Sequence, residues 1–299
     1  MAKLVECIPN FSEGRNEAII LELADAIKST PGVMLLDYSA DVNHNRSVFT
    51  MAGSPEGIIE AVFKCAKTAI ERIDLTKHTG EHPRMGAIDV IPFVPLRGMC
   101  MDECVEMSKA LGKRLWNELR FPVFLYEESA SAQERRNLAT LRRGQFEGMA
   151  EKIKIGFTPD YGDTIHPTAG IAACGARMPL IAFNVNLNTS DLRIADRIAK
   201  TIRESGGGLK SVKAIGVMLH ERNIAQVSIN MTDYTQTPLY RVLELIKAEA
   251  AGFGATATGT EIVGLTPMNA LIGCARHYLM IENFNPETQV LENYLLREL

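Results

Sequence analysis

The sequence predicts an α/β (α+β) protein made of two ferredoxin-like βαββαβ subdomains with a ligand cleft between them. Short apolar runs of strand character alternate with segments of helical periodicity. The order strand–helix–strand–strand–helix–strand then occurs twice along the 299 residues. We expect the first subdomain to span 1–178 and the second 179–299. A single doubly wound sheet is the structural alternative.

The first half supplies its elements in a simple order. Apolar residues at helical spacing predict a helix over Glu17–Lys28. Ser54 is a good N-cap for a second helix, which extends to about Arg72. The predicted strands are, in chain order, Lys3–Pro9, Val33–Tyr38, Ser47–Met51 and Ala87–Val94.

The second half repeats this order. We expect Thr189 or Ser190 to cap a helix that ends near Ser205, where three glycines follow. A second helix is expected over Pro238–Ala251, with its proline near the first turn. The predicted strands are, in chain order, Leu180–Leu187, Val212–Leu219, Ala225–Asn230 and Thr258–Val263.

Between the two halves the pattern is less regular. It predicts a helix at Met101–Leu119, a strand at Pro122–Tyr126 and a polar helix from about Ser131 to Arg143. A long loop is expected over Gly156–Gly175.

Composition narrows the class of protein. Hydrophobic residues make up 46% and charged residues 23%, as in soluble globular proteins. The net charge of −4 and the lack of a Lys/Arg block argue against nucleic acid as a partner. No apolar run reaches the roughly 18 residues of a membrane span, so no membrane partner is expected. Six scattered cysteines and a start without a secretory signal favour a reduced, cytoplasmic protein.

Two of the six histidines, His78 and His82, share one short loop directly before a strand. An imidazole can take up and return a proton near neutral pH, so the loop predicts proton transfer. Gly80 and Pro83 break helical structure, so the spacing of four does not make a helical metal site, and no metal is expected. A carboxylate can orient the ring of His82, and Glu81, Asp89 and Asp37 are the candidates. A solvated, histidine-rich turn is the alternative.

Three further segments concentrate polar residues. Asn10 lies between a strand and a helix N-terminus, where it can face a ligand carboxylate. A hairpin carries Asp37, Asp41, His44, Asn45 and Arg46, and its arginine can hold a carboxylate in a bidentate fork. A Gly/Pro-rich loop over 158–170 is long enough to be functional. The plain alternatives are a capped helix, a solvated hairpin and an interdomain linker.

Three long motifs resemble glutamate formiminotransferase, the N-terminal part of the animal formiminotransferase–cyclodeaminase. They are ECIPNFSEGR at 6–15, HTGEHPRMGAIDVIPFVP at 78–95 and GARMPLIAFNVNLN at 175–188. The resemblance extends over nearly the whole chain. It implies two α/β subdomains and transfer of a formimino group from N-formimino-L-glutamate to N5 of the co-substrate tetrahydrofolate.

The resemblance also implies site residues. His82 matches the catalytic histidine, which would act as base and then as acid, a task that suits a pKa near neutrality. The folate loop corresponds to Gly162, Asp163, Thr164, Ile165, His166, Pro167, Thr168, Ala169 and Gly170, although 166–170 departs from the animal sequence. The remaining candidates for substrate binding are Asn10, Asp37, Arg46, His78, Arg84 and Arg177.

The sequence also leads to expectations about oligomeric state, partner proteins and alternative functions. A homodimer is expected, and a separate cyclodeaminase would close the ring, because the sequence stops at Leu299. Histidine degradation or purine fermentation would supply the donor. The alternatives are a one-carbon enzyme that handles 5-formyltetrahydrofolate and a folate-binding protein without catalysis.

Overall fold

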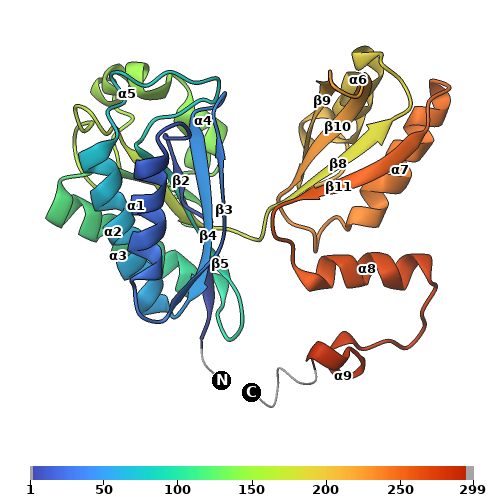
Figure 1. Ribbon diagram of the computed structural model, residues 1–299, viewed down its shortest axis with the longest axis horizontal. Helices are drawn as coiled ribbons and strands as arrows, with labels where there is room; N and C mark the ends of the chain where they lie inside the picture. Colours follow the sequence, from blue (N-terminus) through green and yellow to red (C-terminus); the bar gives the residue numbers. More distant parts are fainter. Residues whose placement is uncertain (1–2, 294–299) are drawn as a thin grey trace. The chain divides into compact units, whose positions relative to one another are not determined.

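Two separate β-sheets form, which excludes a single doubly wound sheet. A computed structural model describes residues 3–293 (Figure 1). The chain divides into two units, Met1–Arg177 and Met178–Leu299. The predicted mixed α/β class with two sheets is confirmed. The cleft between the two halves stays a prediction.

In the first unit, N-cap residues and a proline mark where helices and strands begin and end. The helix α1 (Glu17–Lys28) has the predicted bounds, and its N-cap Asn16 accepts hydrogen bonds from two backbone N–H groups of the first turn. Ser54 caps α2 (Pro55–Arg72) as predicted. The first predicted strand, Lys3–Pro9, is shorter than expected, and a separate strand follows Pro9, which has no N–H for a strand ladder. The strands are β1 (Val5–Cys7), β2 (Asn10–Phe11), β3 (Val33–Asp41), β4 (Arg46–Gly53) and β5 (Ile88–Pro95).

The middle of the chain enlarges this sheet. After α3 (Met101–Leu119), β6 (Val123–Glu127) and β7 (Ala172–Ala176) join it, so that β5, β7 and β6 run parallel. The sheet order is β3, β4, then β1 and β2 at one position, then β5, β7 and β6. The first five strands with α1 and α2 therefore have the predicted βαββαβ order.

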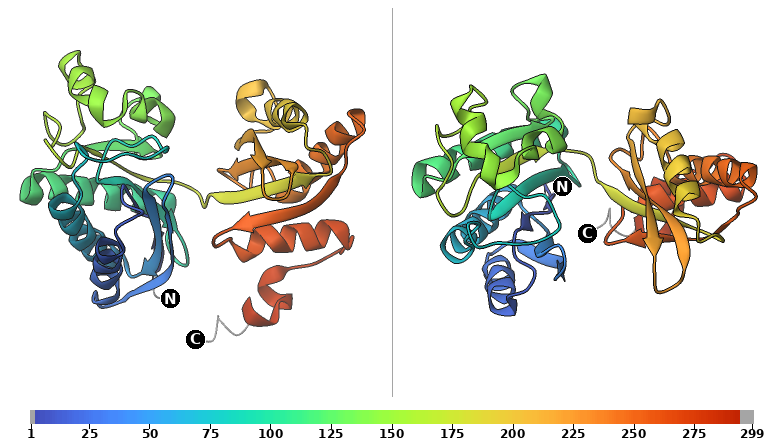
Figure 2. Two further views of the ribbon diagram at one scale, coloured as in Figure 1. Left: turned by 45° about the horizontal axis from the view of Figure 1, so that its top comes forward. Right: turned by 90° about the horizontal axis from the view of Figure 1, so that it is seen from above.

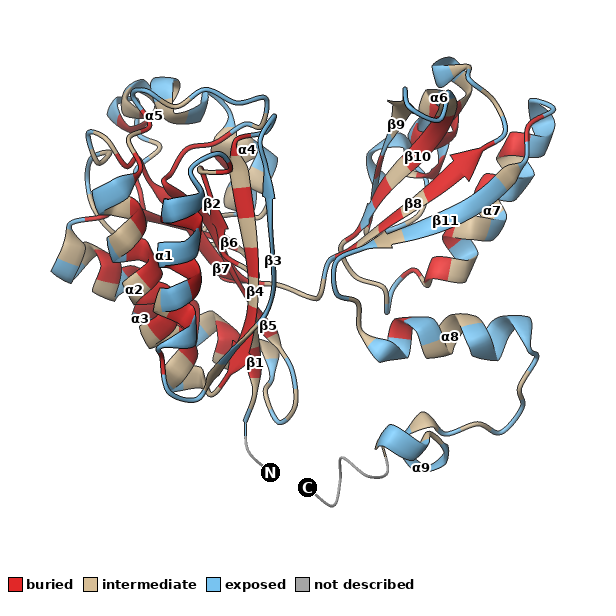
Figure 3. Ribbon diagram, viewed as in Figure 1, coloured by how far each residue is buried: buried red, intermediate tan, exposed pale blue. Residues whose placement is uncertain are grey.

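Both faces of the parallel part are covered. The helices α1, α2 and α3 lie on one face (Figures 1 and 2), and Figure 3 shows the buried residues beneath them. A smaller apolar cluster fills the other face beneath α4 (Leu138–Arg142) and α5 (Gln145–Lys154). Every residue of β5 except its last is buried, as expected for a strand between two layers.

Two expectations for the middle segment are wrong, and one helix was missed. The predicted loop over 156–175 contains β7, because a central strand under two layers needs small residues rather than the usual large β-formers. The polar helix predicted from Ser131 is a 3₁₀ turn (Gln133–Arg135) followed by the short α4. The helix α5 was not predicted at all.

The second unit has a four-stranded antiparallel sheet in the order β11-β8-β10-β9, which is the split-βαβ arrangement. Its helix α6 is capped by Asp191, not by Thr189 or Ser190, because the aspartate side chain accepts the N–H of Arg193. The helix α8 packs on α7. The elements are β8 (Ile181–Leu187), α6 (Leu192–Ile202), a 3₁₀ turn (Glu204–Gly206), β9 (Val212–Leu219), β10 (Ile224–Met231), α7 (Leu239–Gly252), β11 (Ala257–Val263), α8 (Met268–Tyr278) and α9 (Pro286–Gln289).

The helices within residues 3–293 include none that is long and apolar enough to cross a membrane.

Candidate active site

Several of the predicted site residues meet at one end of the first unit's sheet. There the start of β5, the end of β2 and the β3–β4 hairpin surround the loop that carries the two histidines. They form a small pocket that their own side chains nearly fill. Its lining residues are Phe11, Ser12, His44, Asn45, Arg46, His78, His82, Arg84 and Asp89.

Asn45 joins three of these segments. It has a left-handed backbone (φ 49°) and a buried side chain. Its amide oxygen accepts the N–H of Gly14 at 2.9 Å, and its amide nitrogen donates to the carbonyl of Thr79 at 3.0 Å. Its own carbonyl accepts from Nε2 of His78 at 3.0 Å. The hairpin is therefore fixed to the histidine loop.

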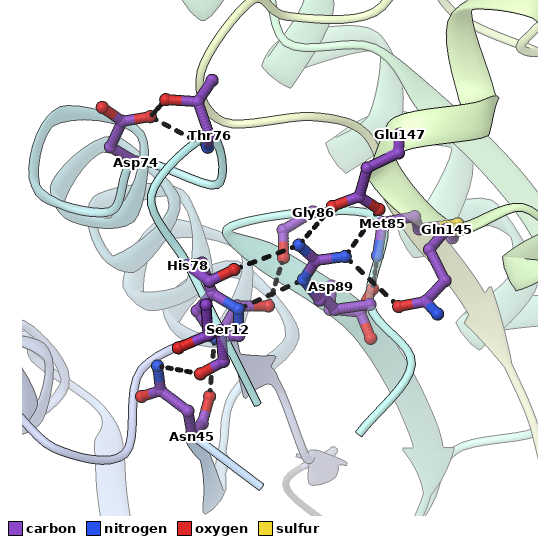
Figure 4. A network of polar contacts seen from close by, with 12 residues as sticks. Ser12, Asn45, Asp74, Thr76, His78, Met85, Gly86, Asp89, Gln145 and Glu147 are labelled. Carbon is purple, nitrogen blue, oxygen red and sulfur yellow. Dashed lines mark hydrogen bonds and ion pairs between the residues drawn. The ribbon is translucent and has the colours of Figure 1, made fainter. Parts of the chain in front are cut away.

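Arg84 links the histidine loop to α5. It is buried, and it forms a bidentate pair with Glu147 of α5 at 2.9 and 2.6 Å (Figure 4). Its Nε donates to Nδ1 of His78 at 3.1 Å, so that nitrogen is the acceptor and the proton of His78 is on Nε2. Arg84 already holds a carboxylate of its own chain, so in this arrangement it positions His78 and the loop.

His82 lies beside an arginine. The guanidinium of Arg46 contacts the ring, and it also donates to the amide oxygen of Asn10, from Nε at 3.1 Å. Nδ1 of His82 lies 2.7 Å from the carbonyl of Pro83. One amino group of Arg46 contacts both ring nitrogens, and a guanidinium has only donors, so at least one ring nitrogen accepts from it. His82 is therefore neutral in this arrangement.

The environment of His82 opposes its protonation. Burial, and then the charges of Arg46 and Arg142, lower the pKa of His82 to about 4, while Asp89 acts weakly in the opposite direction. The expected pKa near neutrality is therefore wrong for this pocket, because two cations stand near a half-buried ring. Burial also lowers the pKa of Arg46 to about 10, which leaves it charged at neutral pH.

Asp89 binds Met85 and Arg142 and does not orient the ring of His82. One carboxylate oxygen accepts the N–H of Met85 at 2.8 Å, and the other pairs with Arg142 of α4 at 2.5 Å. Sequence reasoning missed Arg142, because its segment was interpreted as a solvated polar helix. The pattern of two adjacent arginines in that segment is too common to mark a site.

Two predicted residues lie away from this pocket. Asp37 is exposed on β3, opposite Thr50. Arg177 follows β7, where its N–H donates to the carbonyl of Phe93 at 3.0 Å. Phe93 is four residues from Asp89 along β5, which corresponds to about 13 Å. The structure thus brings Asn10, Arg46, His78, His82 and Arg84 together, but not these two.

The segment predicted to bind folate runs beside the histidine loop. Gly170 is antiparallel to Gly86, and Ala87 donates to the carbonyl of Ala169 at 2.8 Å. Nδ1 of His166 accepts the N–H of Ala169 at 3.0 Å, which shapes the turn. The segment therefore supports the wall of the pocket, and its role toward folate stays a prediction.

The comparisons with known proteins agree with this architecture. Residues 4–177 match the model of the formiminotransferase domain, N-terminal subdomain, and residues 182–294 match the model of the formiminotransferase domain. The chain belongs to the formiminotransferase family. It is similar to the glutamate formimidoyltransferase of Streptococcus pyogenes serotype M1, with 58% identity over 99% of this chain and 100% of that protein.

Two other members of the formiminotransferase family show its range. The glutamate formimidoyltransferase of Thermoplasma acidophilum is 46% identical over 97% of this chain and 96% of its own length. The formimidoyltransferase-cyclodeaminase of Rattus norvegicus is also 46% identical, over 93% of this chain but only 53% of its own length. This chain therefore corresponds to about half of the rat protein.

Proposed function

We propose that this protein transfers the formimino group of N-formimino-L-glutamate to N5 of tetrahydrofolate, giving 5-formiminotetrahydrofolate and glutamate. The 58% identity to a glutamate formimidoyltransferase over both full lengths supports the reaction. The observation that carries the chemistry is the neutral imidazole of His82, held against Arg46 in a pocket of the first unit.

His82 acts as the general base. Because its pKa is about 4, it is unprotonated at neutral pH and ready to accept a proton. It takes the proton of N5 as N5 attacks the formimino carbon, and a tetrahedral intermediate forms. The bond from that carbon to the glutamate nitrogen then breaks, and in the simplest course His82 returns the proton to that nitrogen. Such a group typically contributes about 10²- to 10⁴-fold in rate.

Arg46 links donor binding to the state of His82. A carboxylate of formiminoglutamate is a better acceptor for the guanidinium than a neutral imidazole, because charge-assisted hydrogen bonds are the stronger ones. When Arg46 turns to that carboxylate, the ring nitrogen of His82 that accepts from it is released for N5. The neutralised charge also lets the pKa of His82 rise toward its ordinary 6.5. Asn10 holds the guanidinium in reach of both acceptors.

The pocket is our candidate place for the reacting ends of the ligands. Its own side chains nearly fill it in this arrangement, so they have to move apart when a ligand binds. The pteridine of tetrahydrofolate and the formimino group would meet here, and the rest of the folate would extend beyond it. The loop 162–170 is our candidate for contacts to the folate, and Arg177 and Asp37 are candidates for the more distant parts of the substrates.

A coupled assay tests the reaction. Tetrahydrofolate is mixed with formiminoglutamate, the mixture is acidified, and the methenyl chromophore is followed. We expect a signal that depends on both substrates. A signal only with 5-formyltetrahydrofolate and ATP would instead favour the one-carbon alternative, and folate binding without any turnover would favour a binding protein. The family matches favour neither alternative.

We also propose a cytoplasmic homodimer that hands its product to a separate cyclodeaminase. Analytical ultracentrifugation tests the dimer. The name of the rat protein joins the two activities, which supports a link between this transferase and a cyclodeaminase.

A further inference from the structure

A second imidazole lines the same pocket as His82. The ring centroids of His44 and His82 are 6.1 Å apart, and the ring planes are nearly perpendicular, at 89°. His44 lies in the four-residue turn 42–45 between β3 and β4. Nothing in the base chemistry of His82 gives His44 a task.

A carboxylate orients this second ring. Oδ2 of Asp41 lies 3.1 Å from Nδ1 of His44, and Oδ1 accepts the backbone N–H of the same residue at 2.8 Å. That backbone hydrogen bond is the main cause of the lowered pKa of Asp41, which keeps the carboxylate ionised. Nδ1–H therefore points to Asp41, and Nε2 is the nitrogen left for a ligand. A carboxylate on Nδ1 fixes the tautomer and stabilises the imidazolium, as in catalytic triads.

Hydrogen bonds to backbone carbonyls join the turn that carries His44 to the loop that carries His82. The N–H of Glu81 donates to the carbonyl of Asn43 at 3.2 Å, and Asn45 donates to the carbonyl of Thr79 at 3.0 Å. Gly80 packs against the carbonyl of His44 so closely that a Cβ there would lie 2.3 Å from its oxygen. The turn and the histidine loop are therefore one framework.

Other charged groups face His44 besides Asp41. The pocket also contains the cations Arg46 and Arg84 and the carboxylate of Asp89, which is paired with Arg142. Arg84 is paired with Glu147, so Arg46 is the cation that changes partner when a donor binds. Once its charge is balanced by the donor, the carboxylate of Asp41 is the charged group in direct contact with the ring of His44.

We propose that His44, oriented by Asp41, donates a proton to the departing glutamate nitrogen, while His82 accepts the proton of N5. This inference rests on the proposed function and divides its two proton transfers between two rings. The bond from N5 to the formimino carbon forms as the N5 proton moves to His82. The bond from that carbon to the glutamate nitrogen breaks as that nitrogen takes the proton of His44. His82 ends protonated and His44 neutral, and both reset by exchange with water, to which His44 is about half exposed.

Three variants test this division in the coupled assay, with kcat and KM measured across pH. His44→Gln should lower kcat by about 100-fold or more and remove the fall in rate at high pH, with little change in the KM of either substrate. Asp41→Asn should also lower kcat, because the ring of His44 loses the carboxylate that orients it. His220→Gln is the matched control, since His220 lies in the corresponding β9–β10 turn of the second unit and is exposed. It should leave rate and pH profile unchanged.

Two results would overturn the inference. One is a parental kcat for His44→Gln. The other is a lowered kcat with an unchanged pH profile, which would mean that His44 acts only through structure; thermal melting of each variant separates this case from unfolding. Failure of the proposed function is different, because the parent protein itself would then show no formimino transfer.

Discussion

The guanidinium of Arg46 donates a hydrogen bond to the ring of His82, so a cation holds the proposed base in its unprotonated form. In most acid–base sites a carboxylate orients the histidine and raises its proton affinity. Here the arginine does the reverse, and the pKa of His82 falls to about 4. The basicity of His82 thereby depends on what else Arg46 binds.

Replacing Arg46 with methionine should raise the pKa of His82 from about 4 toward 6.5, because a nearby positive charge and its hydrogen bond are removed. An NMR titration of the His82 ring protons measures this shift. Arg222→Met, on an exposed turn of the second unit, is the control and should leave the titration unchanged. An unchanged His82 titration in Arg46→Met would show that the charge of Arg46 does not set its pKa.

The same pKa makes stability depend on pH. The unfolded chain protonates His82 near pH 6.5 and the folded chain only near 4, so the unfolded state binds more protons between these values. Folding stability should therefore fall as the pH drops from 6.5 toward 4, and less so in His82→Gln. Urea unfolding midpoints at pH 7 and pH 4.5 measure the difference. An equal fall in both proteins would contradict the lowered pKa.

Asn45→Ala should both destabilise the first unit and reduce kcat. The loss of its buried side-chain hydrogen bonds should cost about 1–3 kcal/mol. Asn223→Ala is the matched control, because Asn223 has a similar left-handed backbone (φ 50°) in the β9–β10 turn but is exposed. In both variants, alanine in that left-handed conformation lowers the free energy of unfolding by about 1 kcal/mol. Equal midpoint shifts and equal activities would mean that Asn45 does not lock the turn to the loop.

Local sequence signals predicted most of the fold. The helices α1 and α3 have their predicted bounds, because regular apolar spacing and clear end residues define them. The strand β7 escaped prediction because Ala172–Ala176 lacks the large β-branched side chains that mark a strand. Its position forbids them: a Cβ on Gly175 would lie 2.2 Å from the carbonyl oxygen of Tyr126. Such a constraint comes from neighbouring strands and is invisible in the local sequence.

The site was predictable to the extent that its residues stand in dense motifs. His82, Arg46 and Asn10 were expected, and they are in contact through the guanidinium. The partners Arg142 and Glu147 were not expected, because they lie 53 and 63 residues from Asp89 and Arg84, on short helices without a marked pattern. Which carboxylate pairs with which arginine is decided by tertiary packing alone.

The most direct test of the central claim is formimino transfer by His82→Ala, with and without added imidazole. We predict a rate about 10²- to 10⁴-fold below that of the parent, unchanged folate binding, and partial recovery as imidazole is added. His220→Gln should transfer at the parental rate throughout. Transfer by His82→Ala at the parental rate without imidazole would contradict the assignment of His82 as the base.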